Sequence, residues 1–303
     1  MRKSYIVLGT LLLICVVIAA VLASTPEGPP EQLAVAEAKA DGPAFTFVVF
    51  GDNRPNGADL AQPQTFKKIL AKMDALNPAF AVNTGDCIYG SWNPLKVREQ
   101  YEEYTETTKS LFKPKVHLAL GNHEIVGSLA NQAFFAKELG APYYSFDYED
   151  SHFIILNSEV VGQTARITGK QLDWLKEDLK KARAARHKFV FLHRPLYPVD
   201  GHKGKCLDKH PEDRDALHSL FVRNRITVVF AGHEHLFHEQ VKNGVRYIIT
   251  GGGGAFLYPS IHGKGDFHHF VVVSAAGDKV EMKVVKPALR GKPEEVIPIG
   301  EKK

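Results

Sequence analysis

Cysteine is scarce in this chain, and its scarcity excludes several classes of protein. Of the 303 residues only 3 are cysteines: Cys15 in an N-terminal apolar run, and Cys87 and Cys206 in the remaining body. This number is too small for a disulfide framework, and no CxxC pair suited to a zinc ribbon is present. The sequence leaves open a single bridge between Cys87 and Cys206, which an oxidising compartment would allow.

A large excess of charge of one sign is also missing. The 38 Lys and Arg residues nearly balance the 34 Asp and Glu residues, and the basic residues are scattered along the chain. We therefore expect no nucleic-acid partner. The content of 44% hydrophobic and 24% charged residues is ordinary for a globular protein and excludes disorder as an overall description. Histidine, by contrast, is abundant, with 14 residues, and imidazole is the commonest metal ligand.

The first residues predict export. Arg2 and Lys3 form a positive region, and an apolar run follows at residues 5–23. Residues 1–24 are predicted to be either a cleaved signal peptide or an N-terminal membrane anchor, because the run would span about 28 Å as a helix, close to the hydrocarbon thickness of a bilayer. In both cases the positive flank places the body outside the cytoplasm, in the periplasm or the extracellular space or anchored at the membrane.

The rest of the chain predicts a linker and one α/β domain. Residues 25–43, rich in Pro, Glu, Ala and Lys, are typical of a linker, and residues 44–303 form the predicted domain. Strands alternate with helical patterns at first, which implies crossover connections. Strands are expected at 45–50, 79–83, 115–120, 188–192 and 226–231, helices at 64–76, 94–111, 131–139 and 168–186, and a hairpin at 143–148 and 152–157. Further strands at 237–241, 245–250, 267–274 and 280–285 follow one another through short turns.

A chemically distinctive group of residues follows each of five predicted strands. The chain reads GDNR at 51–54, GDCIY at 85–89, GNHE at 121–124, VFLH ending at His193, and GHEH at 232–235. Ligands of open α/β sheets bind beyond the carboxyl ends of the strands, so these five turns can converge on one crevice. Taken singly, an Asp after a strand is more often a helix cap, and a lone His is more often a hydrogen-bonded core or surface residue. Five such turns in order predict a catalytic metal site instead.

These motifs resemble those of the calcineurin-like metallophosphoesterase superfamily, and within it the purple acid phosphatase pattern GDx, GDxxY, GNHE, VxxH and GHxH. The resemblance runs from Gly51 to His235 and so covers most of the predicted domain. It implies an α/β fold of four layers, an α/β/β/α sandwich of two mixed sheets flanked by helices. It also implies two metal ions about 3.5 Å apart.

The resemblance further implies a role for each motif residue. The first metal would be held by Asp52, Asp86, Tyr89 and His235, with Asp86 bridging to the second. The second metal would also be held by Asn122, His193 and His233. Asn122 and His123 would contact the substrate, and His123 would protonate the leaving group.

The chemistry of these side chains agrees with the implied roles. A bridging carboxylate offsets the repulsion between two cations, and an Asn carbonyl with two imidazoles suits a borderline divalent ion such as Zn²⁺ or Mn²⁺. A metal pair lowers the pKa of a shared water and clamps the phosphoryl oxygens. Glu124, next to His123, is expected to orient the ligands from behind and not to bind metal itself.

One position departs from the superfamily pattern. Most members carry His two residues after the first Asp, whereas this chain carries Arg54, and a guanidinium cannot ligate a metal. Tyr89 is placed to supply the missing ligand, as in purple acid phosphatases, where the phenolate favours a ferric ion; its alternative is a buried loop aromatic. Arg54 either binds the substrate phosphate as a bidentate donor or pairs with a nearby carboxylate.

Two further segments border the predicted site. The loop at 195–211 is expected either to form the pocket rim and select the substrate or to be simply solvated. The glycine run at 251–254 is expected to permit close backbone approach to the site, because no helical pattern follows it. His262, His268 and His269 are expected on loop or strand surfaces.

The sequence thus predicts an exported or membrane-tethered hydrolase of phosphoric esters, similar to acid phosphatases. Its hydroxide would be activated by two metal ions, Fe³⁺ and a divalent Fe, Zn or Mn ion. The expected substrate is a small-molecule phosphomonoester, and a phosphodiesterase of nucleotides or phospholipid head groups is the alternative with the same chemistry. A non-catalytic metal- or phosphate-binding protein is the alternative of a different class. Apart from a membrane tether at residues 5–23, no obligate protein partner is inferred.

Overall fold

The computed structural model describes residues 42–199, 201–257, 265–289 and 291–300, all within the compact unit Ala38–Lys303. The predicted export segment and nearly all of the predicted linker lie outside these ranges. Within them, no helix combines the length and the apolarity needed to cross a membrane.

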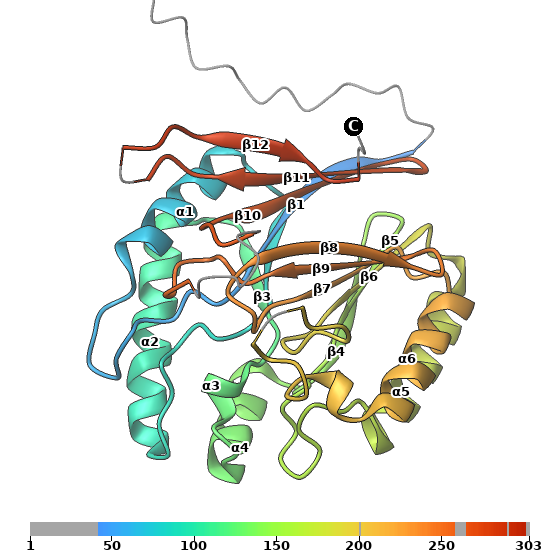
Figure 1. The fold of residues 1–303 in the computed structure, drawn as a ribbon, viewed down its shortest axis with the longest axis horizontal. Helices are drawn as coiled ribbons and strands as arrows, with labels where there is room; N and C mark the ends of the chain where they lie inside the picture. Colours follow the sequence, from blue (N-terminus) through green and yellow to red (C-terminus); the bar gives the residue numbers. More distant parts are fainter. Residues whose placement is uncertain (1–41, 200, 258–264, 290, 301–303) are drawn as a thin grey trace, which may run out of the picture. The chain divides into compact units, whose positions relative to one another are not determined.

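The first of two sheets has six strands in the order β12-β11-β10-β1-β2-β3 (Figure 1). Strands β1, β2 and β3 are parallel to one another, and the other three continue the sheet in antiparallel fashion. The bounds are Ala44–Phe50 (β1), Phe80–Asn83 (β2), Lys115–Leu118 (β3), Phe270–Ala276 (β10), Lys279–Lys286 (β11) and Glu295–Pro298 (β12).

The second sheet also has six strands, in the order β4-β5-β6-β7-β9-β8, and it too is mixed. Strands β5, β6, β7 and β9 are parallel, while β4 and β8 pair antiparallel at its edges. The bounds are Tyr144–Tyr148 (β4), Ser151–Ile155 (β5), His187–Phe191 (β6), Val228–Ala231 (β7), Phe237–Lys242 (β8) and Val245–Thr250 (β9).

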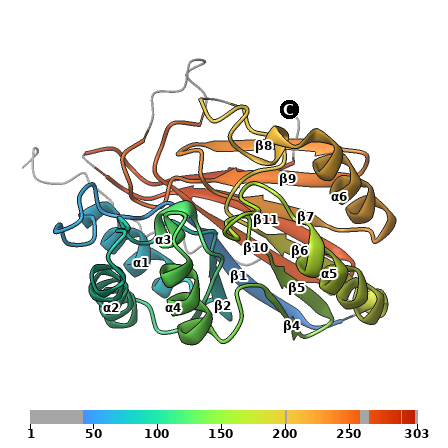
Figure 2. The ribbon, with the colours of Figure 1, turned by 90° about the horizontal axis from the view of Figure 1, so that it is seen from below.

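Helices cover the outer face of each sheet. Figure 2 shows α1 to α4 on one side of the strands and α5 and α6 on the other. The bounds are Gln64–Ala75 (α1), Pro94–Leu111 (α2), Asn122–Ile125 (α3), Leu129–Leu139 (α4), Gly169–Lys181 (α5) and Pro211–Arg223 (α6). The predicted four-layer sandwich of two mixed sheets is therefore confirmed.

Three hydrophobic cores hold the four layers together. One lies between α1, α2, α4 and the first sheet, and another between α5, α6 and the second sheet. The third lies between the sheets and is rich in aromatic residues, with Phe47 and Phe153 at its centre and ring centroids 5.2 Å apart. Alternate residues of β1 face different cores, which is why this strand is apolar at every position except Thr46.

The predicted elements are found close to their expected bounds, with three omissions. Helix α2 starts where predicted because the Asn93 side chain accepts a hydrogen bond from the Leu95 amide and Pro94 occupies the first turn. Helix α5 ends at Lys181, earlier than predicted, and a short 3₁₀ turn follows. Helices α3 and α6 and strand β12 were not predicted. Their sequences are short or polar, and contacts with the rest of the fold decide their structure.

The topology brings the predicted site turns together. In the first sheet Phe50 pairs with Asn83 and Asn83 with Leu118, so the turns after β1, β2 and β3 start side by side. The turns after β6 and β7 adjoin in the second sheet, where the Gly232 amide donates to the His193 carbonyl at 2.9 Å. Both sets of turns lie at the carboxyl ends of parallel strands, where α/β proteins bind ligands.

Candidate dinuclear metal site

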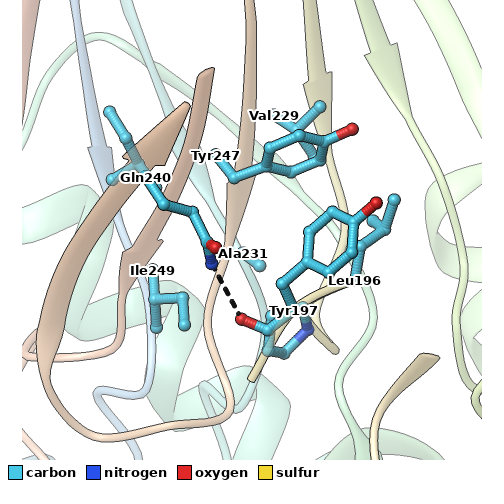
Figure 3. Close-up of a pocket in the computed structure, with 9 residues that line it drawn as sticks. Leu196, Tyr197, Val229, Ala231, Gln240, Tyr247 and Ile249 are labelled. Carbon is cyan, nitrogen blue, oxygen red and sulfur yellow. Dashed lines mark hydrogen bonds between the residues drawn. The ribbon is translucent and has the colours of Figure 1, made fainter. Parts of the chain in front are cut away.

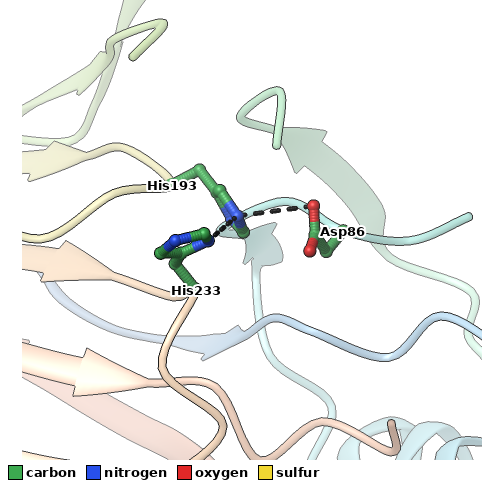
Figure 4. Close-up of side chains that lie close together, drawn as sticks. All are labelled: Asp86, His193 and His233. Carbon is green, nitrogen blue, oxygen red and sulfur yellow. Dashed lines mark hydrogen bonds and ion pairs between the residues drawn. The ribbon is translucent and has the colours of Figure 1, made fainter. Parts of the chain in front are cut away.

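Two clusters of buried metal-ligand side chains form where these turns meet. One contains Asp86, His193 and His233, and the other contains Asp52, Asp86 and His235. In each cluster one ligand atom per residue lies within 4.8 Å of the others. Figure 4 shows the first cluster, with His193 between His233 and Asp86. Since Asp86 belongs to both clusters, its carboxylate is placed to bridge two ions.

The backbone at three of these residues adopts a left-handed conformation. The φ angles are 55° at Asp52, 57° at Asp86 and 70° at His233. Such angles cost energy for residues with a Cβ atom, and they cluster at functional sites where the surroundings hold them. Hydrogen bonds hold them here: the Asp52 amide donates to the Gly85 carbonyl at 2.9 Å, and the Asp52 carboxylate accepts from the His233 amide at 2.9 and 3.1 Å.

The tautomers of two histidines suit metal binding. His193 Nδ1 lies 3.0 Å from the carbonyl of Thr84, and His235 Nδ1 lies against the carbonyl of Phe256. A carbonyl can only accept, so each Nδ1 carries a proton, and in the neutral form of the ring each Nε2 presents a lone pair toward the cluster. This arrangement of backbone carbonyl and imidazole is typical of histidines that ligate metals.

The lone pairs of His193 and His235 point at other acceptors. Nε2 of His193 lies 3.0 Å from Asn122 Oδ1 and 3.4 Å from Asp86 Oδ1. Nε2 of His235 lies 3.4 Å from Asp52 Oδ1. Acceptors at such distances repel one another unless a proton or a metal cation lies with them. The donor set, with carboxylate, amide and imidazole groups, fits a pair of metal ions.

The local electrostatics also follow from this crowding. Burial raises the pKa of Asp86, but His193, His123 and Arg54 beside it bring the net pKa below its usual value. Burial lowers the pKa of His233 far below its usual value, and the neighbouring His193 and Arg194 lower it further. His233 is therefore neutral and able to donate an electron pair.

Glu124 lies behind the ligands and holds their loops. It is fully buried, and its carboxylate accepts hydrogen bonds from four backbone amides. Oε1 accepts from Cys87 at 2.8 Å and from Ile88 at 3.3 Å, and Oε2 accepts from Asp86 at 2.9 Å and from Gly121 at 2.7 Å. Burial and the nearby Asp86 raise the pKa of Glu124. The contacts are those of a group that orients ligand loops from behind.

A second buried network, which the sequence did not reveal, ties the first two turns together. Asn83 Oδ1 accepts the Gly85 amide at 2.9 Å, and Asn83 Nδ2 donates to Asn53 Oδ1 at 2.9 Å and to the Tyr104 hydroxyl at 3.1 Å. Gln62 Nε2 donates to the Cys87 carbonyl at 2.9 Å. Single amides at a strand end carry no spacing signal, so only the folded structure identifies this network.

His123, Tyr89 and Arg54 lie at the edge of the clusters. His123 Nδ1 contacts the Tyr89 carbonyl, and His123 Nε2 lies 3.9 Å from Asp86 Oδ2. Tyr89 is 37% exposed, and its ring centroid lies 5.9 Å from that of His123 and 5.8 Å from Arg54 Cζ. The alternative of a buried loop aromatic at Tyr89 is therefore wrong.

Arg54 is mostly buried beside Asp86. Its Nε lies 4.0 Å from Asp86 Oδ2, which is long for an ion pair, and Nε has no hydrogen-bond partner among the described residues. One guanidinium nitrogen donates to the Pro55 carbonyl at 3.3 Å. The guanidinium thus has a donor available toward the clusters.

The loop after β6 brings further groups to the site. Arg194 binds Glu159 through two hydrogen bonds of 2.7 and 3.0 Å, and its Nη1 lies 3.1 Å from His233 Nε2. The His202 ring lies 4.4 Å from the His233 ring. The sequence indicated this loop as a pocket rim but gave no signal for Arg194 or Glu159, because their pairing joins different strands.

The glycine run permits close backbone approach, as predicted. The Gly253 amide donates to the Gly51 carbonyl at 2.8 Å, and the amide of Ala255 donates to the Asp52 carbonyl at 2.9 Å. A side chain at Gly253 would collide with Gly51. His269 packs against the same run and is fully buried, so its predicted surface position is wrong; His262 lies outside the described residues.

The two body cysteines do not pair in the structure. Both are free, buried thiols. Cys87 packs in the core between the first sheet and its helices, whereas Cys206 precedes α6 on the other side of the molecule. Burial raises the pKa of both thiols, so neither favours the reactive thiolate form.

Two cavities lie away from the ligand clusters. The smaller, about 10 Å³, is enclosed by Tyr197, Tyr247 and Gln240 (Figure 3) and has room for about one water. Gln240 Nε2 donates to the Tyr197 carbonyl across it at 3.1 Å. The larger, about 280 Å³, lies between the loop at 55–62 and α2. Neither is lined by a predicted metal ligand.

A four-layer sandwich with two carboxylate and imidazole clusters that share one aspartate defines the dinuclear metallophosphoesterase class. The sequence model of the family described as calcineurin-like phosphoesterase matches residues 45–237. The chain belongs to this family.

Curated relatives are plant purple acid phosphatases. Purple acid phosphatase 23 of Arabidopsis thaliana is 28% identical over 198 residues, which cover 55% of this chain and 41% of that protein. Purple acid phosphatase 5 of the same plant is 25% identical over 217 residues, which cover 69% of this chain and 48% of that protein. The chain thus spans less than half the length of these relatives.

Solved structures share the fold. A purple acid phosphatase from yellow lupin seeds superposes with a TM-score of 0.66 at 17% identity, covering 85% of this chain and 54% of the other. A dimetal phosphatase from Danio rerio gives a TM-score of 0.57 at 16% identity, with 84% and 98% covered. GAP50 of Plasmodium, described as the anchor in the inner membrane complex, gives a TM-score of 0.59 at 16% identity, and the match covers 86% of this chain and 90% of GAP50.

Proposed function

We propose that this protein hydrolyses phosphoric monoesters at a dinuclear metal centre. The observation that carries the proposal is the pair of ligand clusters that share Asp86, each with histidine lone pairs directed at neighbouring acceptors. The family and its purple acid phosphatase relatives support the same reaction class.

The metals would occupy the two clusters. Asp52, His235 and the Tyr89 phenolate would hold one ion, with Fe³⁺ favoured by the phenolate, and Asn122, His193 and His233 would hold a divalent Fe, Zn or Mn ion. Asp86 would bridge them. When bound, such a pair lowers the pKa of a shared water and neutralises the phosphoryl oxygens.

The residues at the edge would handle the substrate. Asn122 and Arg54 would bind the phosphoryl oxygens, because the Arg54 guanidinium has a donor without a partner and faces Asp86. His123 would give a proton to the leaving oxygen. His202, which packs against His233, would line the same site.

Metal analysis combined with a substrate panel tests the proposal. We expect two metal ions per chain, with turnover of para-nitrophenyl phosphate exceeding that of bis-para-nitrophenyl phosphate at least tenfold. Asp86→Asn should lose metal and activity, whereas Asp173→Asn on the exposed face of α5 should change neither. Two bound metals with no turnover would favour the non-catalytic alternative, and preference for the diester would favour a phosphodiesterase.

A separate measurement tests Arg54. Arg54→Gln should raise KM for the aryl phosphate by roughly tenfold, because a charge-assisted hydrogen bond to the phosphate is lost. The metal content should stay unchanged, since Arg54 is not a ligand. An unchanged KM would show that Arg54 serves only to pair with Asp86.

We also propose that the protein is exported, with residues 1–24 as a cleaved signal or a retained anchor. The positive flank and the apolar run at 5–23 support this. N-terminal sequencing of the protein from membrane and soluble fractions distinguishes the two forms. Recovery in the cytoplasm with the first residues intact would contradict both.

A further inference from the structure

Large apolar side chains are exposed around the ligand clusters. Among the described residues, eight large apolar or aromatic side chains are more than about a third exposed. Six of them lie in the segments that follow strand ends, four in loops and two in the first turns of α2 and α4. Tyr89 belongs to the site itself. The other five, here called the apolar rim, are Leu60, Trp92, Leu95, Leu129 and Phe256, with exposed fractions of 59%, 71%, 68%, 68% and 64%.

The rim is attached directly to the candidate site. The Phe256 carbonyl accepts a hydrogen bond from His235 Nδ1. The Trp92 ring lies over Gly127, just beyond the GNHE turn. An ion pair of 2.7 Å between Lys96 and Asp59 joins the loop that carries Leu60 to the start of α2, which carries Leu95. Phe256 and Trp92 therefore adjoin segments that carry the candidate site, and Leu60 and Leu95 lie on two segments that are joined to each other.

Single exposed apolar residues are ordinary, but five of them on segments that follow the strand ends of one site are not. Contiguous apolar patches on soluble proteins mark interaction surfaces. The two remaining exposed residues, Val241 on β8 and Tyr148 at the β4–β5 turn, lie on other parts of the fold. The concentration at one edge thus calls for a specific occupant.

Basic residues on another loop of the site favour an anionic lipid surface. The loop that brings His202 against His233 also carries the exposed residues Lys203 and Lys205. Lysine is depleted in protein–protein interfaces, whereas basic residues next to Trp and Leu side chains are typical of segments that bind the interface of anionic membranes.

The N-terminal sequence is compatible with such a surface. The apolar run at 5–23 predicts a signal or an anchor, and residues 25–43 would reach roughly 60 Å when extended. Strand β1, which separates the linker from the site turn, spans only about 23 Å. A tether of this length allows the carboxyl end of β1 to reach the membrane surface.

We propose that the apolar rim docks on a lipid bilayer and that the substrates are phosphomonoesters of amphipathic lipids presented at its surface. The inference rests on the proposed phosphomonoesterase function and names its substrate class. Trp92 and the rim leucines would enter the interfacial region, and Lys203 and Lys205 would contact anionic head groups. With the rim docked, the phosphate of the lipid substrate would lie next to the ligand clusters.

Surface kinetics with the full chain test this inference. Hydrolysis of phosphatidic acid in detergent mixed micelles is compared with that of para-nitrophenyl phosphate in the same detergent. The variant Trp92→Ser/Leu95→Ser/Leu129→Ser should lose at least tenfold in kcat/KM on phosphatidic acid and stay within twofold on the aryl phosphate. Val241→Ser, at an exposed position away from the rim, should change neither rate. Both substrates are measured on the same preparation, so loss of folding would be seen as loss of aryl phosphate turnover.

The possible results separate the inference from the proposed function. Equal turnover of phosphatidic acid by the wild type and the rim variant would overturn the inference. Hydrolysis of the aryl phosphate but not of phosphatidic acid by the wild type would also overturn it. In both cases the proposed function stands. No turnover of either substrate would overturn the proposed function itself. An oligomer that dissociates in the rim variant would identify the rim as a protein interface and also overturn the inference. Loss of the dependence on anionic lipid content in Lys203→Ser/Lys205→Ser would support it.

Discussion

Replacing Glu124 by glutamine changes one carboxylate oxygen to an amide group while keeping the shape of the side chain. Each Glu124 oxygen accepts two backbone amides, so in either orientation the new NH₂ group faces two donors and leaves them without a partner. Hydrogen bonds to a charged acceptor contribute roughly 1.5–3 kcal/mol each, which sums to about 3–6 kcal/mol. A neutral amide costs less to bury than a carboxylate, and the expected net loss is about 2–4 kcal/mol.

Urea unfolding of the chelator-treated protein measures this loss without a contribution from bound metal. Zinc titration of the folded protein should in addition show an affinity reduced by about 10- to 100-fold, because the loop that carries Asp86 is no longer held. Glu106→Gln, at an exposed position on α2, should stay within about 0.5 kcal/mol of the wild type. If Glu124→Gln also unfolds within that margin, the four amide contacts do not support the loops as argued.

Three further changes have defined outcomes. Tyr89→Phe should abolish a visible phenolate-to-iron charge-transfer band in the iron-loaded protein, and a colourless, zinc-only active wild type would contradict the phenolate assignment. Asn83→Leu should lower the free energy of unfolding by about 2–4 kcal/mol, because the Gly85 amide and Asn53 Oδ1 lose their partner; an unchanged denaturation midpoint would rule out that role. His152 lies 2.6 Å from Asp147 and 2.9 Å from Asp178; burial lowers the pKa of His152, but these carboxylates bring the net pKa above its usual value. Because the pKa of His152 is raised by folding, its stabilisation is complete below the pKa of the unfolded state and is lost as the pH rises through the pKa of the folded state. His152→Gln should therefore lower the free energy of unfolding by on the order of 1 kcal/mol more at pH 6 than at pH 9. Equal losses of stability at the two pH values would exclude the ion pair.

Much of the fold was predictable because its elements have strong local signals. Strands β1 and β6 carry runs of apolar residues that lead into a glycine or a histidine turn, and α2 begins at an asparagine cap followed by proline. Helix α6 and strand β12 were missed for the opposite reason. The first is mostly polar, and the second pairs with β11 at a sheet edge, so nonlocal contacts determine both.

The same division holds for the candidate site. The order of the GD, GNHE and GHEH turns identified the side chains that meet, since each motif lies at a strand end and parallel strands in each sheet end on the same edge. The left-handed backbone at Asp52, Asp86 and His233 could not be predicted, because non-glycine residues adopt it only when surrounding hydrogen bonds hold them there.

The sequence by itself determined the class of chemistry, because the identity of each ligand and its place after a strand are local properties. Only the tertiary structure decided which other groups surround that chemistry. The pairing of Arg194 with Glu159, the contact of His202 with His233 and the position of the apolar rim all join segments that are distant along the chain. Such contacts depend on how two sheets and their helices pack, and packing leaves no short-range pattern in the sequence.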